Sequence, residues 1–201
     1  MNVLIINTHL TYRGWSEGKL NLTFADCATD FFRARGHQVA HTCVEQGYDP
    51  QEEVAKHVAA DLVILQMPVN WFGAPWIYKK YVDEVFNVGL NTKVFLEGDG
   101  RTRHDPSRQY GTGGKMQGRT FMICATWNAP QDAFDNPHSF MYGGKGTDDL
   151  FLHITSNYKF IGFDILPAYG VFDIFKDPDI PRALDGYERH LERYCALSPA
   201  L

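Results

Sequence analysis

Short apolar runs recur along this chain, and segments with helical spacing lie between them. The runs that predict strands cover residues 3–7, 38–44, 61–67, 120–126 and 165–169. The run over residues 61–67 is apolar at nearly every position, which is typical of a strand buried on both faces of a parallel sheet. The sequence therefore predicts an α/β fold.

The segments between these runs predict the helices that cover the sheet. Apolar residues at helical spacing predict helices over residues 16–35, 50–60, 75–86 and 187–195, and Gly36 is suited to end the first. Strands that alternate with helices predict a mainly parallel sheet covered on both faces. Two Gly-rich, polar and aromatic stretches, residues 87–118 and 127–158, are predicted as long binding loops.

Composition excludes several classes of function. The 201 residues are 44% hydrophobic and 21% charged, so we expect one domain over residues 1–201 that buries its own core. A net charge of -5, without a long Lys/Arg run, argues against nucleic-acid binding. The apolar runs are too short to cross a bilayer, so we expect a soluble, cytoplasmic protein. The four cysteines and eight histidines lack metal-binding spacing, and we expect no metal site.

Ligands of an open parallel sheet bind beyond the carboxyl ends of the strands, which directs attention to the segments after Asn7, Met67 and Thr126. None of them carries G-x-G-x-x-G, and no segment completes G-x-x-x-x-G-K-[ST]. A Rossmann dehydrogenase and a P-loop NTPase are therefore excluded as first interpretations.

The three segments have ordinary structural interpretations as well as functional ones. Residues 16–23 form the entrance of the first predicted helix, where backbone N–H groups and Lys19 can hold a phosphate, or the segment is a plain helix cap. Residues 68–76 form an aromatic turn between Pro68 and Pro75 that can hold a planar ring, or a hydrophobic corner. Residues 126–130 form a third turn with one large ring.

Together these motifs carry a family resemblance. P-V-N-W-F-G-A-P-W at residues 68–76, D-G-R-T-R at residues 99–103 and T-W-N-A-P at residues 126–130 resemble the flavodoxin-like quinone reductases called modulator of drug activity B, relatives of DT-diaphorase. The resemblance covers nearly the whole chain. It implies a doubly wound five-stranded parallel sheet of flavodoxin type, FAD as cofactor, NADPH as co-substrate, a quinone as substrate and a homodimer.

The resemblance also implies a set of flavin-binding residues. The pyrophosphate and adenosine side is implied at Ser16, Glu17, Gly18, Lys19, Leu20, Asn21, Leu22 and Thr23, and the ring at Val69, Asn70, Trp71, Phe72, Tyr110, Thr126, Trp127, Asn128 and Ala129. Two departures from the family stand out. The first loop, residues 8–15, is bulkier, and the position of a flavin-side His falls near residues 142–144, so no protein proton donor is assigned.

The implied activity is a two-electron ping-pong reaction, in which hydride passes from NAD(P)H through flavin N5 to a quinone. Backbone N–H groups of Trp127 and Asn128 are expected near flavin N1 and O2, where negative charge grows. Other functions keep the same fold: an azo or nitro compound reductase, a redox sensor that docks on a membrane transporter, and an electron carrier. The aromatic loops argue against the carrier, which holds FMN at an exposed edge. Arg101 and Arg103 with Asp99 and Asp105 can form a phosphate clamp for NADPH, but a charged run in a polar loop is more often a solvated ion-pair surface, which is the interpretation favoured here.

Overall fold

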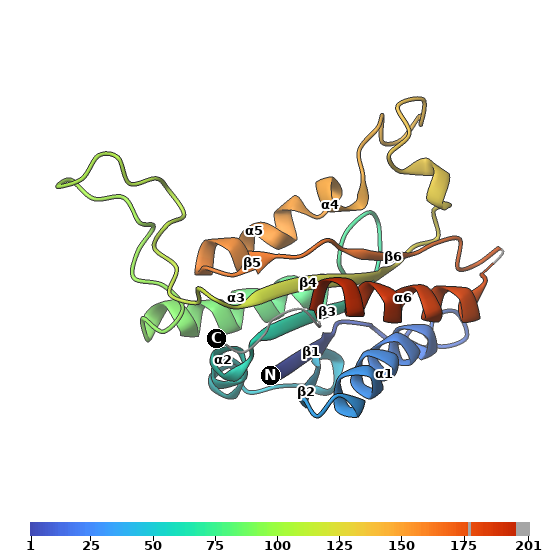
Figure 1. Cartoon of the computed structure of the whole chain (residues 1–201), viewed down its shortest axis with the longest axis horizontal. Helices are drawn as coiled ribbons and strands as arrows, with labels where there is room; N and C mark the ends of the chain where they lie inside the picture. The colour runs from blue at the N-terminus through green and yellow to red at the C-terminus, as the bar shows by residue number, and fades with distance from the viewer. Residues whose placement is uncertain (177, 196–201) are drawn as a thin grey trace.

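The computed structural model describes residues 1–176 and 178–195, and its centre is a parallel sheet in the order β2-β1-β3-β4-β5 (Figure 1). The strands are β1 (Asn2–Asn7), β2 (Gln38–Cys43), β3 (Leu62–Pro68), β4 (Thr120–Thr126), β5 (Asp164–Ile165) and β6 (Tyr169–Val171). β5 and β6 both pair with β4, so the sheet has five strand positions and the fifth is shared. The predicted flavodoxin-like architecture is confirmed.

The shared fifth position corrects the prediction of one continuous strand over residues 165–169. β5 pairs with Thr120 and Phe121, whereas β6 pairs further along β4, at residues 124–126. Leu166 still donates its N–H to the carbonyl of Phe121 at 2.9 Å. Pro167 follows and has no N–H to donate, so the ladder is interrupted there and resumes at Tyr169.

Alternate residues of the strands fill two hydrophobic layers. Leu4 and Val63 face a layer that includes Val54, Ile77 and Ile154 of the helices on one side. Ile5 and Ile64 face a layer that includes Phe24 and Leu191 on the other side. All seven residues of β3 are buried, which explains why its sequence is apolar on both faces.

All four predicted helices form, and two further helices were missed. The first two lie close to their expected bounds, whereas the third ends five residues later and the last begins seven residues earlier than predicted. The long helices are α1 (Lys19–Ala34), α2 (Pro50–Ala59), α3 (Trp76–Asn91) and α6 (Ile180–Cys195); the missed ones are α4 (Thr147–Leu150) and α5 (Leu152–Ile161), and two 3₁₀ helices cover Val44–Gln46 and Gln131–Ala133. The loop predicted over residues 127–158 is therefore wrong in its second half. α5 buries only Ile154, Tyr158 and Ile161 and is rich in β-branched and aromatic residues, so its sequence carries a weak helical signal. Within the described residues, every helix is too short or too polar to cross a bilayer.

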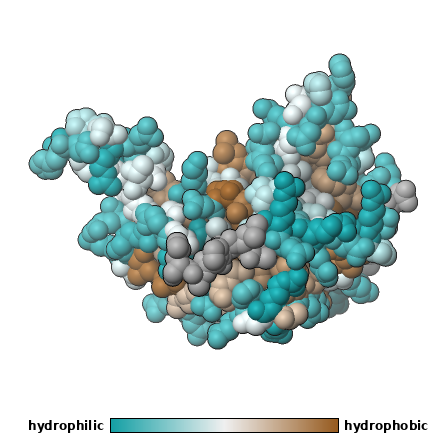
Figure 2. Space-filling view, viewed as in Figure 1, coloured by the Kyte–Doolittle hydropathy of each residue, from teal (hydrophilic) through white to brown (hydrophobic). Residues whose placement is uncertain are grey.

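Residues 97–114 form an arm that stands away from the body (Figure 1). The arm follows α3, which runs antiparallel to the strands, and so it leaves the body at the amino ends of the strands. Its base is closed by backbone hydrogen bonds from Glu97 to Gly113 and from Gly111 to Asp99, at 3.2 and 2.7 Å. A Cβ at Gly113 would lie 2.1 Å from the carbonyl oxygen of Gly98, so glycine permits this close approach. Mostly hydrophilic side chains cover the arm (Figure 2).

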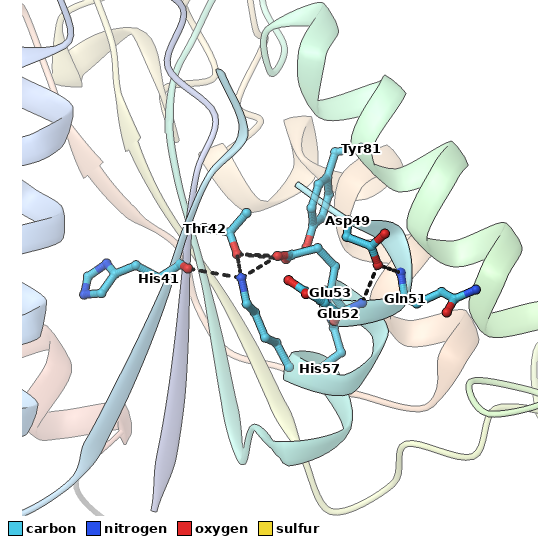
Figure 3. A network of polar contacts seen from close by, with 9 residues as sticks. His41, Thr42, Asp49, Gln51, Glu52, Glu53, His57 and Tyr81 are labelled. Carbon is cyan, nitrogen blue, oxygen red and sulfur yellow. Dashed lines mark hydrogen bonds and ion pairs between the residues drawn. The ribbon is translucent and has the colours of Figure 1, made fainter. Parts of the chain in front are cut away.

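A buried polar cluster joins β2, α2 and α3 (Figure 3). The carboxylate of Glu53, only 1% exposed, accepts hydrogen bonds from Thr42 at 2.8 Å and from Tyr81 at 2.6 Å. Lys56 lies 2.6 Å from the same carboxylate, so the buried charge has a counter-ion. α2 begins where its sequence predicts, because Asp49 caps the N–H groups of residues 51 and 52 and Pro50 follows it.

His57 completes this cluster as a neutral side chain. Its Nδ1 lies 2.8 Å from the carbonyl oxygen of Glu53 and its Nε2 lies 3.2 Å from the hydroxyl of Tyr158. Because a carbonyl oxygen only accepts, Nδ1 carries the proton and Nε2 accepts from Tyr158. Complete burial lowers the pKa of His57 from 6.5 to about 4.

We predict that His57 makes the fold sensitive to acid. Between pH 6.5 and pH 4 the unfolded chain binds a proton at this residue and the folded chain does not, so the free energy of unfolding falls as the pH is lowered. The wild type should lose about 3 kcal/mol more than His57→Gln over this window, measured by urea unfolding. His104→Gln, at an exposed histidine, should behave like the wild type. Equal losses in the wild type and His57→Gln would contradict the assignment.

Candidate functional site

The carboxyl ends of β1, β3 and β4 open into a cleft of about 1380 Å³. Its lining combines all three segments that the sequence analysis singled out. Fourteen of the predicted residues line it: Ser16, Glu17, Gly18, Lys19, Leu20, Asn21, Val69, Asn70, Trp71, Phe72, Thr126, Trp127, Asn128 and Ala129. The topology explains this, because parallel strands deliver their following loops to one edge of the sheet.

Three predicted residues do not line the cleft. Leu22 and Thr23 lie within α1, where the Thr23 hydroxyl donates to the carbonyl of Lys19 at 2.9 Å. Tyr110 lies on the arm, and its ring packs against Phe160 of α5 with a centroid distance of 5.3 Å. Since the arm leaves the sheet at the end opposite the cleft, Tyr110 does not reach the cleft of its own chain.

The entrance of α1 offers unpaired backbone donors. Gly18 is the N-cap residue, with φ at 77°, and no side chain accepts a hydrogen bond there. The first turn of α1 contains no acidic residue, whereas Lys19 pairs with Glu17 at 3.1 Å. The cap is therefore a glycine, which leaves the first N–H groups of α1 without a side-chain acceptor. Free N–H groups at the positive end of a helix make it suited to an anion.

Behind Gly18 lies His9, which the sequence analysis did not single out. His9 is 8% exposed and neither ring nitrogen has a hydrogen-bond partner within the described residues. A Cβ at Gly18 would lie 2.1 Å from Cδ2 of this ring. Burial lowers the pKa of His9, with a smaller opposing effect of Glu45. The imidazole therefore supports the backbone of the α1 entrance from behind.

The bulkier first loop folds over the same end of the cleft. Glu45 holds it by accepting hydrogen bonds from the N–H and the hydroxyl of Thr11, each at 2.7 Å. Tyr12 and Trp15 form an edge-to-face pair with a centroid distance of 5.3 Å, and both line the cleft. Sequence motifs did not reveal these two residues, because they belong to the part of the chain that departs from the family.

After β3 the chain makes a strained two-residue turn. Asn70 and Gly73 exchange backbone hydrogen bonds of 2.9 and 3.2 Å around Trp71 and Phe72. The φ angles of Trp71 and Phe72 are 49° and 70°, a region that costs side-chain-bearing residues roughly 1–2 kcal/mol each. Trp71 is also 94% exposed. Strained backbone with an exposed indole, at the mouth of a cleft, is typical of a ligand clamp.

The turn after β4 corrects one expectation about backbone donors. The N–H of Trp127 donates to the carbonyl of Val171 at 2.7 Å, because the ladder between β4 and β6 continues into this residue. This N–H is therefore not available to a ligand, contrary to the prediction from the sequence. The Trp127 indole, 2% exposed, packs between Phe134 and Phe151, and its Nε1 has no partner within the described residues.

A buried chain of amides joins the segments beneath the cleft. Gln66 of β3 donates from Nε2 to the Asn21 side-chain oxygen at 2.9 Å. Asn21 in turn donates from Nδ2 to the hydroxyl of Thr126 at 3.4 Å. These bonds fix the orientation of the Asn21 amide and hold α1 against the ends of two strands. The sequence signal for Gln66 is a polar residue inside an otherwise apolar run.

The cleft has the chemistry of a site for a planar anionic cofactor. Aromatic rings and backbone donors dominate its lining, and its charged members are Glu17, Lys19 and Lys176. Within residues 1–176 and 178–195, no group of three His, Cys, Asp or Glu side chains is placed to hold a metal ion. The rest of the lining comes from the two predicted turns and from residues that were not predicted. The turns add Pro68, Ala74, Pro75, Trp76 and Pro130, and the residues not predicted are Tyr12, Gly14, Trp15, Ala133, Met141, Tyr142, Ile174, Phe175 and Lys176.

Comparison with known proteins agrees with these features. A family described by its flavodoxin-like fold matches residues 1–195. The chain is 39% identical over 193 residues to the NADPH:quinone oxidoreductase MdaB of Haemophilus influenzae, with 96% of this chain and 98% of that protein covered. The resemblance predicted from the motifs is thereby confirmed.

Solved structures share the fold. A protein from Klebsiella pneumoniae assigned as a quinone reductase has a TM-score of 0.73 at 21% identity, over 96% of this chain and 83% of that one. General stress protein 14 of Treponema denticola, solved with FMN, has a TM-score of 0.60 at 15% identity, over 97% of this chain and 95% of that one. At these identities the likeness is one of fold alone.

We predict that Gly18→Ala destabilises the protein more than Gly14→Ala. Both glycines have positive φ, 77° and 73°, so each alanine carries a similar backbone strain of roughly 1 kcal/mol. A Cβ at Gly14 meets nothing within 4 Å, whereas one at Gly18 collides with His9, which adds about 1–3 kcal/mol. Urea unfolding of both variants measures the difference, and His9→Ala combined with Gly18→Ala should recover part of it. Equal losses at both glycines would mean that His9 does not support the α1 entrance.

Proposed function

The chain belongs to the protein family with the flavodoxin-like fold, and from this membership we propose that it is an FAD-dependent NADPH:quinone oxidoreductase. The observation that carries the proposal is one cleft lined both by the strained Trp71–Phe72 turn and by the start of α1, whose first N–H groups have no side-chain cap. A flavin nucleotide needs both features, one for its ring and one for its phosphates. MdaB of Haemophilus influenzae, at 39% identity, carries the activity in its name.

Bound FAD would supply the hydride transfer from NADPH to the quinone, and the residues of this chain would bind and orient the cofactor and both substrates. The α1 entrance holds the pyrophosphate with backbone N–H groups and Lys19. The turn at Trp71 and Phe72 would hold the ring edge, and the N–H of Asn128 would be the backbone donor for flavin N1 and O2, since the N–H of Trp127 is bonded to Val171. Aromatic walls exclude water and offer one face on which nicotinamide and quinone stack in turn.

The aromatic residues at the α1 end of the cleft favour FAD over FMN. Beyond the α1 entrance the lining continues to Tyr12 and Trp15, whose paired rings can stack on an adenine. FMN ends at its phosphate and would leave this aromatic end empty. General stress protein 14 binds FMN on a related fold, so the bulky first loop is the feature that we propose for discrimination.

Tyr110 connects the proposed cofactor site to a homodimer. Its own cleft is out of reach, so its proposed flavin contact requires the cleft of a second copy of the chain. Exposed aromatic residues beside the cleft, Trp71 at 94% and Trp76 at 66%, agree with an assembly in which the second copy covers part of this surface. An electron carrier needs an open flavin edge and no such cover, which makes it the weaker alternative.

We predict that the purified protein is yellow and releases FAD. Chromatography of the flavin released by denaturation measures this directly. Apoprotein offered equal amounts of FAD and FMN should take up FAD, because only FAD fills the end formed by Tyr12 and Trp15. Replacement of Trp15 by Ala should reduce this preference by about two- to tenfold, the effect of one aromatic contact. Uptake of FMN at equal stoichiometry by the wild type would contradict the proposal.

We predict that plots of reciprocal initial rate against reciprocal quinone concentration, recorded at several fixed NADPH concentrations, give parallel lines. One face serves both substrates, so oxidised nicotinamide must leave before the quinone enters. Tyr110→Ala should lower kcat/KM for both substrates by about two- to tenfold, whereas His104→Ala, another exposed change on the arm, should not. Intersecting lines would indicate two separate substrate sites.

NADPH oxidation that does not depend on quinone would favour the redox sensor, and a preference for azo or nitro compounds would favour that reductase class.

A further inference from the structure

The reaction proposed for this cleft needs a proton that NADPH does not supply. Conversion of a quinone to a hydroquinone adds two electrons and two protons. The hydride that originates on NADPH carries both electrons and one of the protons. The second proton has to come from a side chain of the cleft or from water. Since aromatic walls restrict water in the cleft, a side chain with an acidic hydrogen is the better source.

The cleft offers few side chains that can give up a proton. Its ionisable lining residues are Tyr12, Glu17, Lys19, Tyr142 and Lys176. The first three lie at the α1 entrance, where Glu17 pairs with Lys19 and the ring of Tyr12 packs on Trp15. That end of the cleft is the one proposed for the phosphates and the adenine. Tyr142 and Lys176 therefore remain as candidates at the end where the quinone would react.

Tyr142 is held beside the turn that follows β4. Its ring stacks on Phe134 with a centroid distance of 4.7 Å, and Phe134 packs against the indole of Trp127 at 4.8 Å. The loop that carries it closes at its base, because the N–H of Asp135 donates to the carbonyl of Lys145 at 3.1 Å. Aromatic stacking and loop closure thus fix Tyr142 near the segment proposed for the flavin ring.

Burial separates the two remaining candidates. Lys176 is exposed to solvent, whereas Tyr142 is 9% exposed. Burial raises the pKa of Tyr142 above its usual value of 10, and no charged group of a neighbouring element contributes to this rise. The phenol is therefore protonated at neutral pH, and its proton is shielded from bulk water.

The hydroxyl of Tyr142 is also available to a ligand. Within the described residues no side chain or backbone group forms a hydrogen bond that alters its pKa. Polar atoms that are buried without a partner occur elsewhere, for example in the hydroxyl of Tyr78, and the hydroxyl of Tyr142 is not one of them. It therefore remains accessible from the cleft that the residue lines.

We propose that Tyr142 is the proton donor for quinone reduction in this cleft. The proposal rests on the proposed function and adds a catalytic residue to it. The phenol donates a hydrogen bond to one quinone carbonyl oxygen. As the hydride arrives at the quinone, the O–H bond of Tyr142 breaks, its electron pair stays on the tyrosine oxygen, and a new O–H bond forms on the quinone oxygen. Water then returns a proton to the tyrosinate. Because a hydroquinone is itself a phenol, donor and acceptor have similar acidity, which suits general acid catalysis.

The first test compares the two halves of the reaction in flavin-loaded Tyr142→Phe protein, which keeps the ring that stacks on Phe134. Stopped-flow absorbance measures flavin reduction by NADPH, which needs no proton from the protein, and flavin reoxidation by tetramethyl-1,4-benzoquinone, which does. We expect the reduction rate to stay within about twofold of the wild type and the reoxidation rate to fall about 100-fold or more. Ferricyanide accepts electrons without protons, so it should reoxidise the flavin of both proteins at equal rates.

The second test measures the contact without turnover. Calorimetry of the same quinone with oxidised, flavin-loaded protein should give a dissociation constant about three- to tenfold higher for Tyr142→Phe, which lacks one neutral hydrogen bond. Tyr48→Phe removes a hydroxyl that bonds Glu84 outside the cleft lining, and it should match the wild type in both tests.

The third test moves the pH dependence. Tyr142→His places a different acid on the same loop, so its reoxidation rate should fall as the pH rises above about 6.5, the ordinary pKa of histidine. The wild-type rate should stay constant between about pH 6 and pH 9, because Tyr142 keeps its proton throughout this range.

Three results would contradict the proposal, and they differ from one another. An unchanged reoxidation rate in Tyr142→Phe would mean that another group or water supplies the proton, while the proposed function stands. Equal slowing of both halves and of the reaction with ferricyanide would mean that Tyr142 only supports the shape of the site. Wild-type protein that holds flavin and cannot reduce the quinone would overturn the proposed function itself.

Discussion

The parallel ladder between β3 and β4 is the contact on which the rest of the molecule depends. It pairs Leu62 with Thr120 at one end and Pro68 with Thr126 at the other, so both strands end at the same level. The strained turn and the segment 126–129 begin there, which is why residues far apart in sequence share one cleft. A shift of register by one residue would turn every side chain of β3 to the opposite layer.

Around this ladder the site contains backbone N–H groups without a side-chain acceptor and backbone in a strained conformation. The α1 entrance lacks a side-chain cap, and the turn at Trp71 and Phe72 has a conformation that glycine or asparagine normally adopts. Both states raise the free energy of the folded chain, and the rigid sheet beneath them makes this tolerable. The amide chain from Gln66 through Asn21 to Thr126 adds a buried link between the two halves of the site.

The part of the site that could be predicted from the sequence consists of the segments that follow the carboxyl ends of strands. Motifs at residues 16–21, 69–72 and 126–129 met in one cleft because the topology rule for parallel sheets requires it. The sequence did not reveal Phe175 or Met141, because they come from loops whose path depends on packing rather than on local pattern. α5 was missed for a related reason, since its few buried residues stabilise it through contacts with β4, such as Tyr158 stacked on Phe121.

The sequence by itself determined the fold class, the first four strands with the helices α1, α2, α3 and α6, and the segments that line the cleft, since hydrophobic period and turn residues are local properties. Tertiary structure decided which groups of those segments are available. The N–H of Trp127 is occupied because it pairs with Val171. The course of the arm places Tyr110 at the end of the sheet opposite the cleft of its own chain (Figure 1). Both outcomes depend on hydrogen bonds and contacts between residues that are distant in sequence. The local sequence around Trp127 or Tyr110 contains no signal for such contacts, so only the folded structure reveals them.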